Sequence, residues 1–497
     1  MPEEQKKLPT YGAEFVRCPS SAIGKEVALM HPEKKLWLHF LPVLTAAVVI
    51  TLLSMITSVG IPYITDSFGL TSRQAPWINT AGTMASAVLA PLLGWTGDRR
   101  GIRAQLLIGI FCAVVSNLIC AFTGTFLLFC FGRFLGGIGL AAALPASMKY
   151  ISLQFPEEKK VGGFAVLAAC ICLGSGLGPA VVGLALSKIA WRSLFLLSEI
   201  PLALLGLCVW LTVSGPYGEP RRSKPDAAGM TLLFFGVGAL LALLTLTTQY
   251  SWNGILLPAL LAVSLICLVC FYRREKKTAE PVLDVSLLIN RRFIIPALTG
   301  FFIYGVKCYC CTAVPYYFTQ GLHFPSTVSG SWLTVYFLSG FPLSLGLNRL
   351  NRRFTTRALA VFGAATWLVS MGMLVLSSAD TPLWVFFLSA VISSVGIAIL
   401  GGMPNACALK TVPAERSGAA SGAISTISNL GAAMISAVLI PLLSVIDSRG
   451  GVPDYAASFP KTSLIMLGIL AVCFFLSFFF PANKSSGIPE TKECDGL

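Results

Sequence analysis

Long apolar segments alternate with short polar ones along almost the whole chain. Fourteen of them lie near residues 40–62, 76–95, 104–123, 125–148, 161–187, 193–214, 228–248, 255–272, 293–317, 327–347, 357–377, 383–409, 417–445 and 462–481. About 20 mostly apolar residues let a helix cross the hydrocarbon core of a bilayer. Because no water is present there to bond free backbone groups, each segment is expected to be helical. The pattern predicts an all-α integral membrane protein with about fourteen transmembrane helices.

The composition excludes a water-soluble protein of this length. Of the 497 residues, 55% are hydrophobic and only 12% are charged, whereas soluble domains carry roughly 25% charged residues. The first 35 residues are polar and hold no short apolar core of the kind found in a cleavable secretory signal. We therefore expect the first apolar segment to stay in the bilayer as an anchor.

Lysine and arginine residues are distributed unevenly between the two ends of the predicted helices. If the N-terminus is cytoplasmic, 29 of them lie on the cytoplasmic side, five lie on the other side, and Arg133 and Lys307 lie inside spans. Cytoplasmic connections carry an excess of these residues, so both termini are predicted to be cytoplasmic. The same bias explains the net charge of +14, which indicates attraction to anionic lipid rather than to nucleic acid.

The even number of spans, with both termini on one side, suits a duplicated bundle. Such repeats build many transporters, with the substrate site near the middle of the bilayer between the halves. The predicted organisation is a cytoplasmic segment at 1–39, six-helix bundles at 40–214 and 293–481, a linker with two extra helices at 215–292, and a cytoplasmic tail at 482–497.

The connection after the second span, residues 94–103, combines glycines with closely spaced charges and is expected to form a tight cytoplasmic turn. Glycine allows a sharp reversal of the chain, and an acid such as Asp98 is favoured near a helix N-terminus. Charge pairs that break and re-form would make a two-state gate; simple anchoring by positive charge is the alternative. The candidate gate residues are Gly94, Asp98, Arg99, Arg100, Gly101 and Arg103.

The fifth span holds a second motif at residues 174–183. Pro179 removes a backbone donor and bends the helix, and Gly174, Gly178 and Gly183 are expected to leave one face flat, so that another helix can approach closely. We expect this helix to lie where the two halves move against each other. Simple helix packing is the alternative.

The first motif resembles the loop signature of the major facilitator superfamily, and the second resembles the antiporter motif of its exporters. Further stretches make residues 40–480 similar to the fourteen-span drug:proton antiporters of that superfamily. They are Trp191–Leu196 before Pro201, Asp226–Gly229, Pro281–Asp284 before Arg292, and Pro315–Tyr317 before Gln320. The resemblance implies the major facilitator fold, a polyspecific apolar cavity for small molecules, and proton-driven export.

The first span departs from that family. Members commonly carry an aspartate nine residues before a proline, whereas the residue nine before Pro62 is Leu53 and the span holds no acid. In the family that carboxylate is associated with protons or cationic drugs. Its loss leaves open an exporter or exchanger of an anionic metabolite.

Three charged residues lie well inside predicted spans, where charges usually serve function. Arg133 matches a fourth-span arginine that the resemblance links to proton coupling. Glu199 is the candidate proton-carrying acid. Lys307, with Tyr304 on the same helix face, is the candidate substrate contact. Structural ion pairs are the alternative for all three, including a pair between Lys307 and Glu199.

We therefore expect a secondary active transporter that exports small amphiphilic molecules or drugs, with a non-transporting membrane scaffold or sensor as a further alternative. His31, His39 and His323 are the only histidines, and no nucleophile–base or phosphate-loop pattern accompanies them, so no enzyme is expected. No cofactor, metal or nucleic acid is expected either. The expected form is a monomer in a cell membrane, with a bacterial inner membrane suggested by the short termini and loops.

Overall fold

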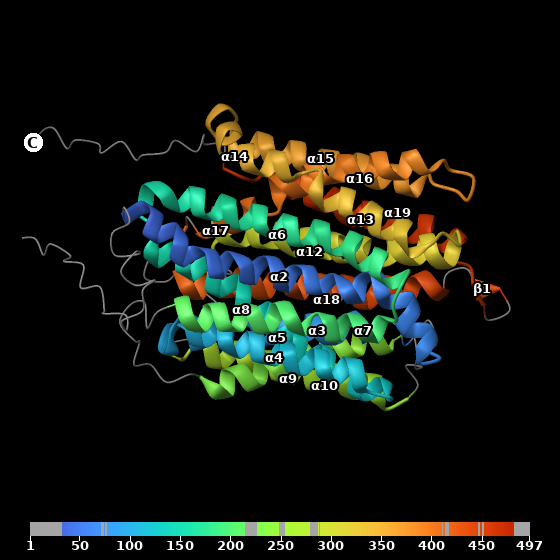
Figure 1. The fold of residues 1–497 in the computed structure, drawn as a ribbon, viewed down its shortest axis with the longest axis horizontal. Helices are drawn as coiled ribbons and strands as arrows, with labels where there is room; N and C mark the ends of the chain where they lie inside the picture. The colour runs from blue at the N-terminus through green and yellow to red at the C-terminus, as the bar shows by residue number, and fades with distance from the viewer. Residues whose placement is uncertain are drawn as a thin grey trace, which may run out of the picture.

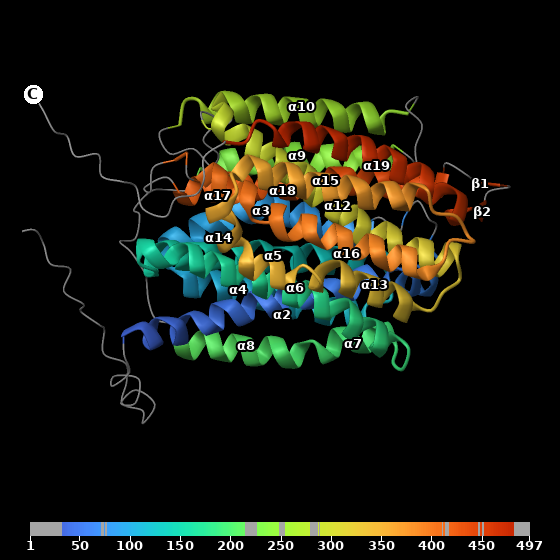
Figure 2. The same ribbon diagram turned by 90° about the horizontal axis from the view of Figure 1, so that it is seen from above.

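The structure of the protein is a computed structural model. It describes residues 32–70, 74, 77–213, 226–247, 254–278, 287, 289–409, 411–412, 417–445, 448–449 and 452–481. These residues are almost entirely helical, and one antiparallel pair of short strands joins β1 (Ser448–Arg449) to β2 (Val452–Pro453). Figures 1 and 2 show the helices running roughly along one common direction, as expected for a bundle that crosses a bilayer.

The helices before residue 214 form what we call the N-terminal group. They are α2 (Pro32–Ser67), α3 (Trp77–Arg100), α4 (Ile102–Phe122), α5 (Phe126–Gln154), α6 (Glu157–Leu186), α7 (Trp191–Leu197) and α8 (Glu199–Thr212). Aromatic rings fill part of its interior. Phe40 of α2 stacks on Tyr150 of α5 with ring centroids 5.3 Å apart and meets Phe155 edge-on at 5.0 Å. Such pairs hold α2 against the end of α5.

The helices after residue 290 form the C-terminal group. They are α12 (Arg291–Tyr316), the π-helical turn η1 (Tyr317–Gly321), α13 (Ser326–Leu338), α14 (Phe341–Arg353), α15 (Thr356–Val375), α16 (Leu383–Leu400), α17 (Met403–Leu409), α18 (Ser417–Val445) and α19 (Tyr455–Ser477). Its core is also aromatic: Tyr317 stacks on Phe459 at 4.2 Å and Trp332 on Tyr336 at 5.1 Å.

Two further helices, α9 (Ala227–Leu246) and α10 (Leu256–Glu275), form a hairpin between the groups in sequence. Asp226 caps α9 by accepting a hydrogen bond of 2.9 Å from the Gly229 amide. It also forms an ion pair of 2.8 Å with Arg274 at the end of α10. α9 packs against both α3 and α18, whereas α10 lies outside it, and Figures 1 and 2 both show the hairpin at one edge of the bundle.

The helices follow the predicted apolar segments closely, with three differences of detail. The first helix begins at Pro32 rather than near residue 40. The sixth predicted span is two helices that meet at Ser198. The segments at 327–347 and 383–409 are likewise each divided in two.

Within the described residues, eleven helices are long and apolar enough to cross a membrane. The other three predicted spans are helical but fall short of that standard. α3 ends in the charged residues 98–100, α13 and α14 are each 13 residues long, and the apolar part of α18 is limited to Ala423–Leu439. The chain is a multi-pass membrane protein, and the number fourteen stays a prediction.

Candidate functional site

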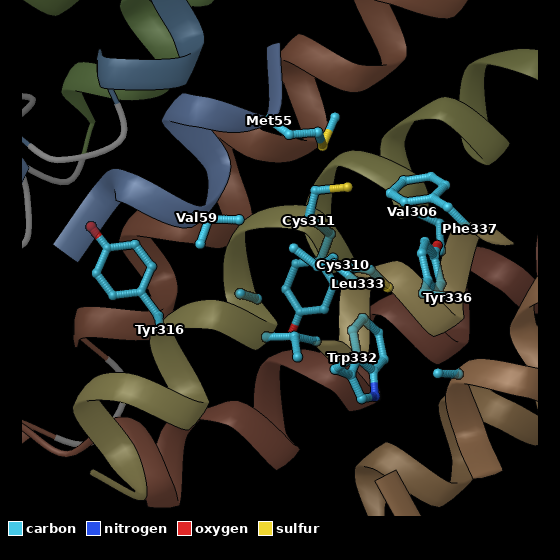
Figure 3. Packing of buried hydrophobic residues seen from close by; sticks show 14 of the residues in the cluster. Met55, Val59, Val306, Cys310, Cys311, Tyr316, Trp332, Leu333, Tyr336 and Phe337 are labelled. Atoms are coloured by element: carbon cyan, nitrogen blue, oxygen red, sulfur yellow. The ribbon is translucent and has the colours of Figure 1, made fainter. Parts of the chain in front are cut away.

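The two groups of helices meet along a seam formed by three helix pairs. α3 packs against α18, α6 against α13, and α2 against α12. Met55 and Val59 of α2 belong to one buried cluster with Cys311 of α12 and Phe337 of α13. Figure 3 shows these side chains gathered where the three helices meet. Any movement of one group against the other must rearrange this cluster.

Helix α6, which carries the motif at 174–183, presents two glycine faces rather than the one predicted. A side chain at Gly174 or Gly178 would collide with α2, since a Cβ at Gly178 would lie 3.0 Å from the Leu52 carbonyl oxygen. Gly183 instead faces α13 across the seam, where its Cβ would lie 3.2 Å from the Ser326 carbonyl oxygen. The reason is helical geometry, because positions four apart share a face and positions five apart do not. Pro179 lies inside α6, as expected.

At one end of the seam, three side-chain hydrogen bonds join the two groups; we call this the bonded end. Tyr63 of α2 donates to Ser326 Oγ at 3.0 Å, and Asn79 Nδ2 of α3 donates to Thr312 Oγ1 at 3.2 Å. The hydroxyl groups of Thr65 and Tyr316 lie 3.5 Å apart. Gly330 packs against Pro179 at the same seam, where a Cβ would lie 2.6 Å from the Pro179 carbonyl oxygen.

Sequence reasoning missed all six hydrogen-bonding residues of the bonded end. Each stands at the end of an apolar segment, where polar residues are common, so no local signal distinguishes it. The pairings join positions more than 230 apart in the chain. Only the packed structure brings them together.

Lys307 lies in α12 among aromatic rings. Its Nζ atom is 5.7 Å from the ring centroid of Tyr304 and 5.2 Å from that of Phe337. The predicted proximity of Tyr304 and Lys307 is therefore confirmed, whereas Phe337, which comes from α13, was not foreseen. Phe337 belongs to the buried cluster that also holds Met55 and Val59 of α2, which places Lys307 beside the seam.

The alternative pair between Lys307 and Glu199 does not form among the described residues. Glu199 is the first residue of α8, and α8 packs against α2, α4 and α7, not against α12. At this helix junction Asn117 of α4 donates a hydrogen bond of 2.7 Å to Ser198 Oγ. The Oε1 atom of Glu199 is buried and has no hydrogen-bond partner within the described chain.

Arg133 lies about two turns into α5, next to small residues that make room for its side chain. A Cβ atom added at Gly82 of α3 would lie 3.6 Å from one terminal guanidinium nitrogen of Arg133. A Cβ atom added at Gly136, on the same helix as Arg133, would lie 3.6 Å from the other. Its Nε atom is buried without a hydrogen-bond partner, and the described residues give it no ion pair. The structural ion pair considered for Arg133 is thus not seen in this part of the chain.

The tight turn predicted for the segment at 94–103 is present but shorter than the segment, most of which is the end of one helix and the start of the next. α3 continues to Arg100, and Gly101, with φ of 88°, turns the chain so that α4 begins at Ile102. Asp98 therefore lies at the C-terminal end of α3 rather than near a helix N-terminus; its side chain and that of Arg99 are outside the described set. Arg103 stacks over Trp210 of α8 with its guanidinium carbon 5.8 Å from the ring centroid.

The remaining residues of this segment serve close packing or face outward. A side chain at Gly97 would collide with Gln105 of α4. Gly94 has open space where a Cβ would lie, and Arg100 is exposed. No group of three or more histidine, cysteine or acidic side chains that could hold a metal occurs among the described residues.

The fold is shared with several solved membrane transporters. A peptide-type (POT family) transporter in complex with 5-aminolevulinic acid superposes with a TM-score of 0.65 at 16% identity, over 90% of this chain and 96% of that one. The human organic anion transporter MFSD10 gives a TM-score of 0.61 at 15% identity, over 90% of this chain and all of that one. Likeness at this level shows the fold alone.

Sequence comparison finds bacterial relatives with named functions. The multidrug export protein EmrB of Haemophilus influenzae is 26% identical over 281 residues, which span 56% of this chain and 54% of that protein. This chain thus matches about half of the length of EmrB. The riboflavin transporter RibZ of Clostridioides difficile is 22% identical over 403 residues, or 81% of this chain and 87% of that protein.

The profile of the Major Facilitator Superfamily matches residues 43–436, from the first apolar helix into α18. The match covers most of the chain and both groups of helices. It agrees with the fold and with the motifs at 94–103 and 174–183. The chain belongs to the Major Facilitator Superfamily and is a membrane transporter, not an enzyme.

Proposed function

We propose that this transporter exports small amphiphilic molecules across the cell membrane by alternating access, driven by proton antiport. The observation that carries the proposal is the bonded end, where hydrogen bonds between the groups close one end of the seam. Lys307 stands five residues before Thr312 and nine before Tyr316 in α12, roughly 8 and 14 Å along the helix axis. The candidate substrate contact therefore lies deeper along α12 than the closed end.

The distribution of lysine and arginine supports export from the cytoplasm. With 29 of these residues on the cytoplasmic side and five on the other, the bonded end is extracellular. A transporter closed on the outside is in the state that receives substrate from the cytoplasm. Opening the bonded end, with closure at the opposite end, would then release the substrate outside.

Two of the predicted motifs suit the moving parts of this cycle. The segment from Gly94 to Arg103 connects α3, which lines the seam, to α4, which does not. α6 contacts α2 through Gly174 and Gly178 and contacts α13 through Gly183. Helices with small residues at the contact can slide without the collision of large side chains. We assign the cytoplasmic gate to the first motif and a sliding contact to the second.

Arg133 and Glu199 suit the proton-coupling step. Each holds a buried polar atom that lacks a partner in the described chain. Two neighbouring residues of α4 lie near these two sites. Ser116 lies against Gly136, one turn after Arg133. Asn117 donates a hydrogen bond to Ser198, next to Glu199. A proton bound at Glu199 would thus be close to polar groups that lead toward Arg133.

Export of an anionic metabolite without a first-span acid is the second candidate. The observation in its favour is the absence of an acid from the apolar part of α2, where Leu53 stands, combined with a lysine at the seam. It differs from the first candidate in the charge of the substrate and in the source of energy. The scaffold alternative has no observation in its favour.

Transport by inside-out vesicles that contain the full chain separates these functions. We expect accumulation of an amphiphilic dye when the vesicle interior is acidified, and its collapse when a protonophore removes the pH gradient. Glu199→Gln should abolish the gradient dependence, while Asp380→Asn, at an exposed position between α15 and α16, should leave it unchanged. Accumulation that ignores the gradient would refute antiport, and no movement of any compound in the panel would refute transport.

A further inference from the structure

Lys307 is a cation whose described neighbours include no acid. The contacts of its ammonium group are the faces of Tyr304 and Phe337, at 5.7 and 5.2 Å from the ring centroids. The ion pair between Asp226 and Arg274 lies at the hairpin, away from α12. Ring faces attract a cation, but they do not neutralise its charge. The protein therefore leaves a positive charge inside the bilayer without a fixed counter-ion, which is unusual because such charges normally pair.

The side chain also faces the seam rather than the lipid. Phe337, whose ring centroid lies 5.2 Å from the ammonium, belongs to the same buried cluster as Val59 of α2, in the N-terminal group. Cys311, one helical turn further along α12, lies in the buried cluster with Met55 of α2, and Figure 3 shows Met55 and Cys311 directed toward each other. Lys307 itself is only half-buried, and its ammonium is not among the fully buried polar groups without a partner. Part of the Lys307 side chain is therefore accessible rather than enclosed by the protein.

The surroundings define the chemistry of a ligand that fits. An anion gains more from a lysine at this depth than at the surface, because the surrounding dielectric is low. A cation would be repelled, and Lys307 already occupies the ring faces that would attract it. The rings of Tyr304 and Phe337 favour a flat apolar body. A small molecule with an aromatic body and one carboxylate satisfies both requirements.

We propose that Lys307, Tyr304 and Phe337 form a binding site for a small aromatic carboxylate, with the carboxylate on the ammonium and the ring system against the two aromatic side chains. The proposal rests on the proposed function, since it names the substrate class of the seam. It specifies that the substrate carries a negative charge and has a flat aromatic body. Phe337 enters from the C-terminal group, so the site needs α12 and α13 in their observed arrangement.

The test compares three naphthalene compounds of nearly equal size: 2-naphthoate, its neutral carboxamide and the cation 2-naphthylmethylammonium. Binding to the purified full chain in neutral detergent is measured by competition against radiolabelled 2-naphthoate. We expect the carboxylate to bind at least tenfold more tightly than the amide, the size expected of one charge-assisted hydrogen bond, and the cation to bind most weakly. Equal binding of carboxylate and amide, or a preference for the cation, overturns the proposal.

Variants then assign the preference to Lys307. Lys307→Met should remove the advantage of the carboxylate while amide binding changes by less than about threefold, which also reports that the site is intact. Lys307→Arg should keep the preference. Lys188→Met, at an exposed position, is the matched control and should change nothing. If Lys307→Met still prefers the carboxylate, the proposal is wrong. If that variant does not fold, the relative affinities of the three ligands for the wild type and for Lys307→Arg still test the proposal.

Two further measurements distinguish a substrate site at Lys307 from a lipid site and from export through another part of the seam. Naphthoate binding is measured in nanodiscs of phosphatidylglycerol and of phosphatidylcholine. If binding is lost only in phosphatidylglycerol, a lipid headgroup occupies the site and the proposal is overturned. If the protein does not bind naphthoate but vesicles that contain it still transport a cationic dye, the binding site at Lys307 is disproved and the proposed export function is retained. Tight, Lys307-dependent binding of naphthoate without its transport would support the site and count against export.

Discussion

The phenol of Tyr63, near the end of α2, donates a hydrogen bond of 3.0 Å to the hydroxyl of Ser326, the first residue of α13, 263 positions away in sequence. This bond links the N-terminal group to the C-terminal group at the bonded end. Ser326 also uses its backbone there, because its carbonyl oxygen lies against Gly183 of α6. One residue of α13 thus meets both α2 and α6, and its contacts must break when this end opens.

Tyr63→Phe should favour opening of the bonded end. A neutral hydrogen bond contributes about 1 kcal/mol, so the ratio of open to closed molecules should rise about fivefold. The measurement is labelling of Cys311, as the single cysteine of an otherwise cysteine-free chain, by a membrane-impermeant thiol reagent added from outside. Cys311 is buried in the described state, so its labelling rate reports opening.

Tyr272→Phe is the matched control for that prediction, because Tyr272 is 44% exposed on α10, away from the seam. Its effect on labelling should be negligible. Ser326→Ala should reproduce the effect of Tyr63→Phe, and the double variant should add little. If Cys311 is labelled as slowly in all four variants as in the parent protein, the bond between Tyr63 and Ser326 does not hold this end closed.

Gly330→Ala should destabilise the contact between α6 and α13. Its Cβ would lie 2.6 Å from the Pro179 carbonyl oxygen, and neither backbone can yield without displacing a helix. Overpacking of this kind costs roughly 1–3 kcal/mol, so we expect a lower midpoint of thermal unfolding and reduced transport. Gly372→Ala is the control, since α15 has open space at that position. A Gly330→Ala chain as stable and active as the control would contradict the close contact.

Asp98→Asn should slow transport while leaving expression and membrane insertion nearly intact. Asp98 lies in the last turn of α3, where the helix dipole disfavours a negative charge. Loss of the charge pair that we propose for the gate, at roughly 1.5–3 kcal/mol for a charged hydrogen bond, corresponds to a slowing of tenfold or more. Uptake by inverted vesicles at matched protein levels provides the measurement, with Asp380→Asn as control. Normal uptake by Asp98→Asn would show that the segment at 94–103 is not a gate and only anchors the helices by its positive charge.

The sequence predicted the helices well because the signal is local. The third span, expected at 104–123, is Ile102–Phe122, and the thirteenth, expected at 417–445, is Ser417–Val445. Apolar runs of bilayer length must be helical whatever their neighbours. The division of the sixth span at Ser198 was not predicted, although Pro201 lies three residues later and has no amide to bond the carbonyl of Leu197. The bond from Asn117 to Ser198, which no local signal indicates, lies at the same break.

The candidate site was predictable only where its residues share one helix. Tyr304 and Lys307 are three positions apart, so helical periodicity alone placed them together. Phe337, which supplies the second ring, comes from α13, and the packing of α12 against α13 has no local signature. The single flat face expected for α6 was wrong for the same reason, since the partners of Gly174 and Gly183 are different helices.

The last prediction concerns the hairpin of α9 and α10. Each helix has 20 residues and is apolar enough to span a bilayer. The ion pair between Asp226 and Arg274 joins the start of α9 to the end of α10, so these two ends lie on the same side of the membrane. Arg274 and its basic neighbours indicate that this side is cytoplasmic. Reporter fusions at Asn253, between the helices, and at Lys276, after them, should therefore report opposite sides.

The ion pair allows a second measurement on the same hairpin. Arg274→Met removes the ion-pair partner of Asp226, whose side chain is only 3% exposed, and an acid left buried without its partner destabilises the fold. We expect a lower midpoint of thermal unfolding with unchanged sidedness of both reporters. Arg273→Met, one residue earlier at an exposed position, should leave the midpoint unchanged. Reporters at Asn253 and Lys276 on the same side would remove the hairpin from the membrane, leaving twelve spans or a different bundle.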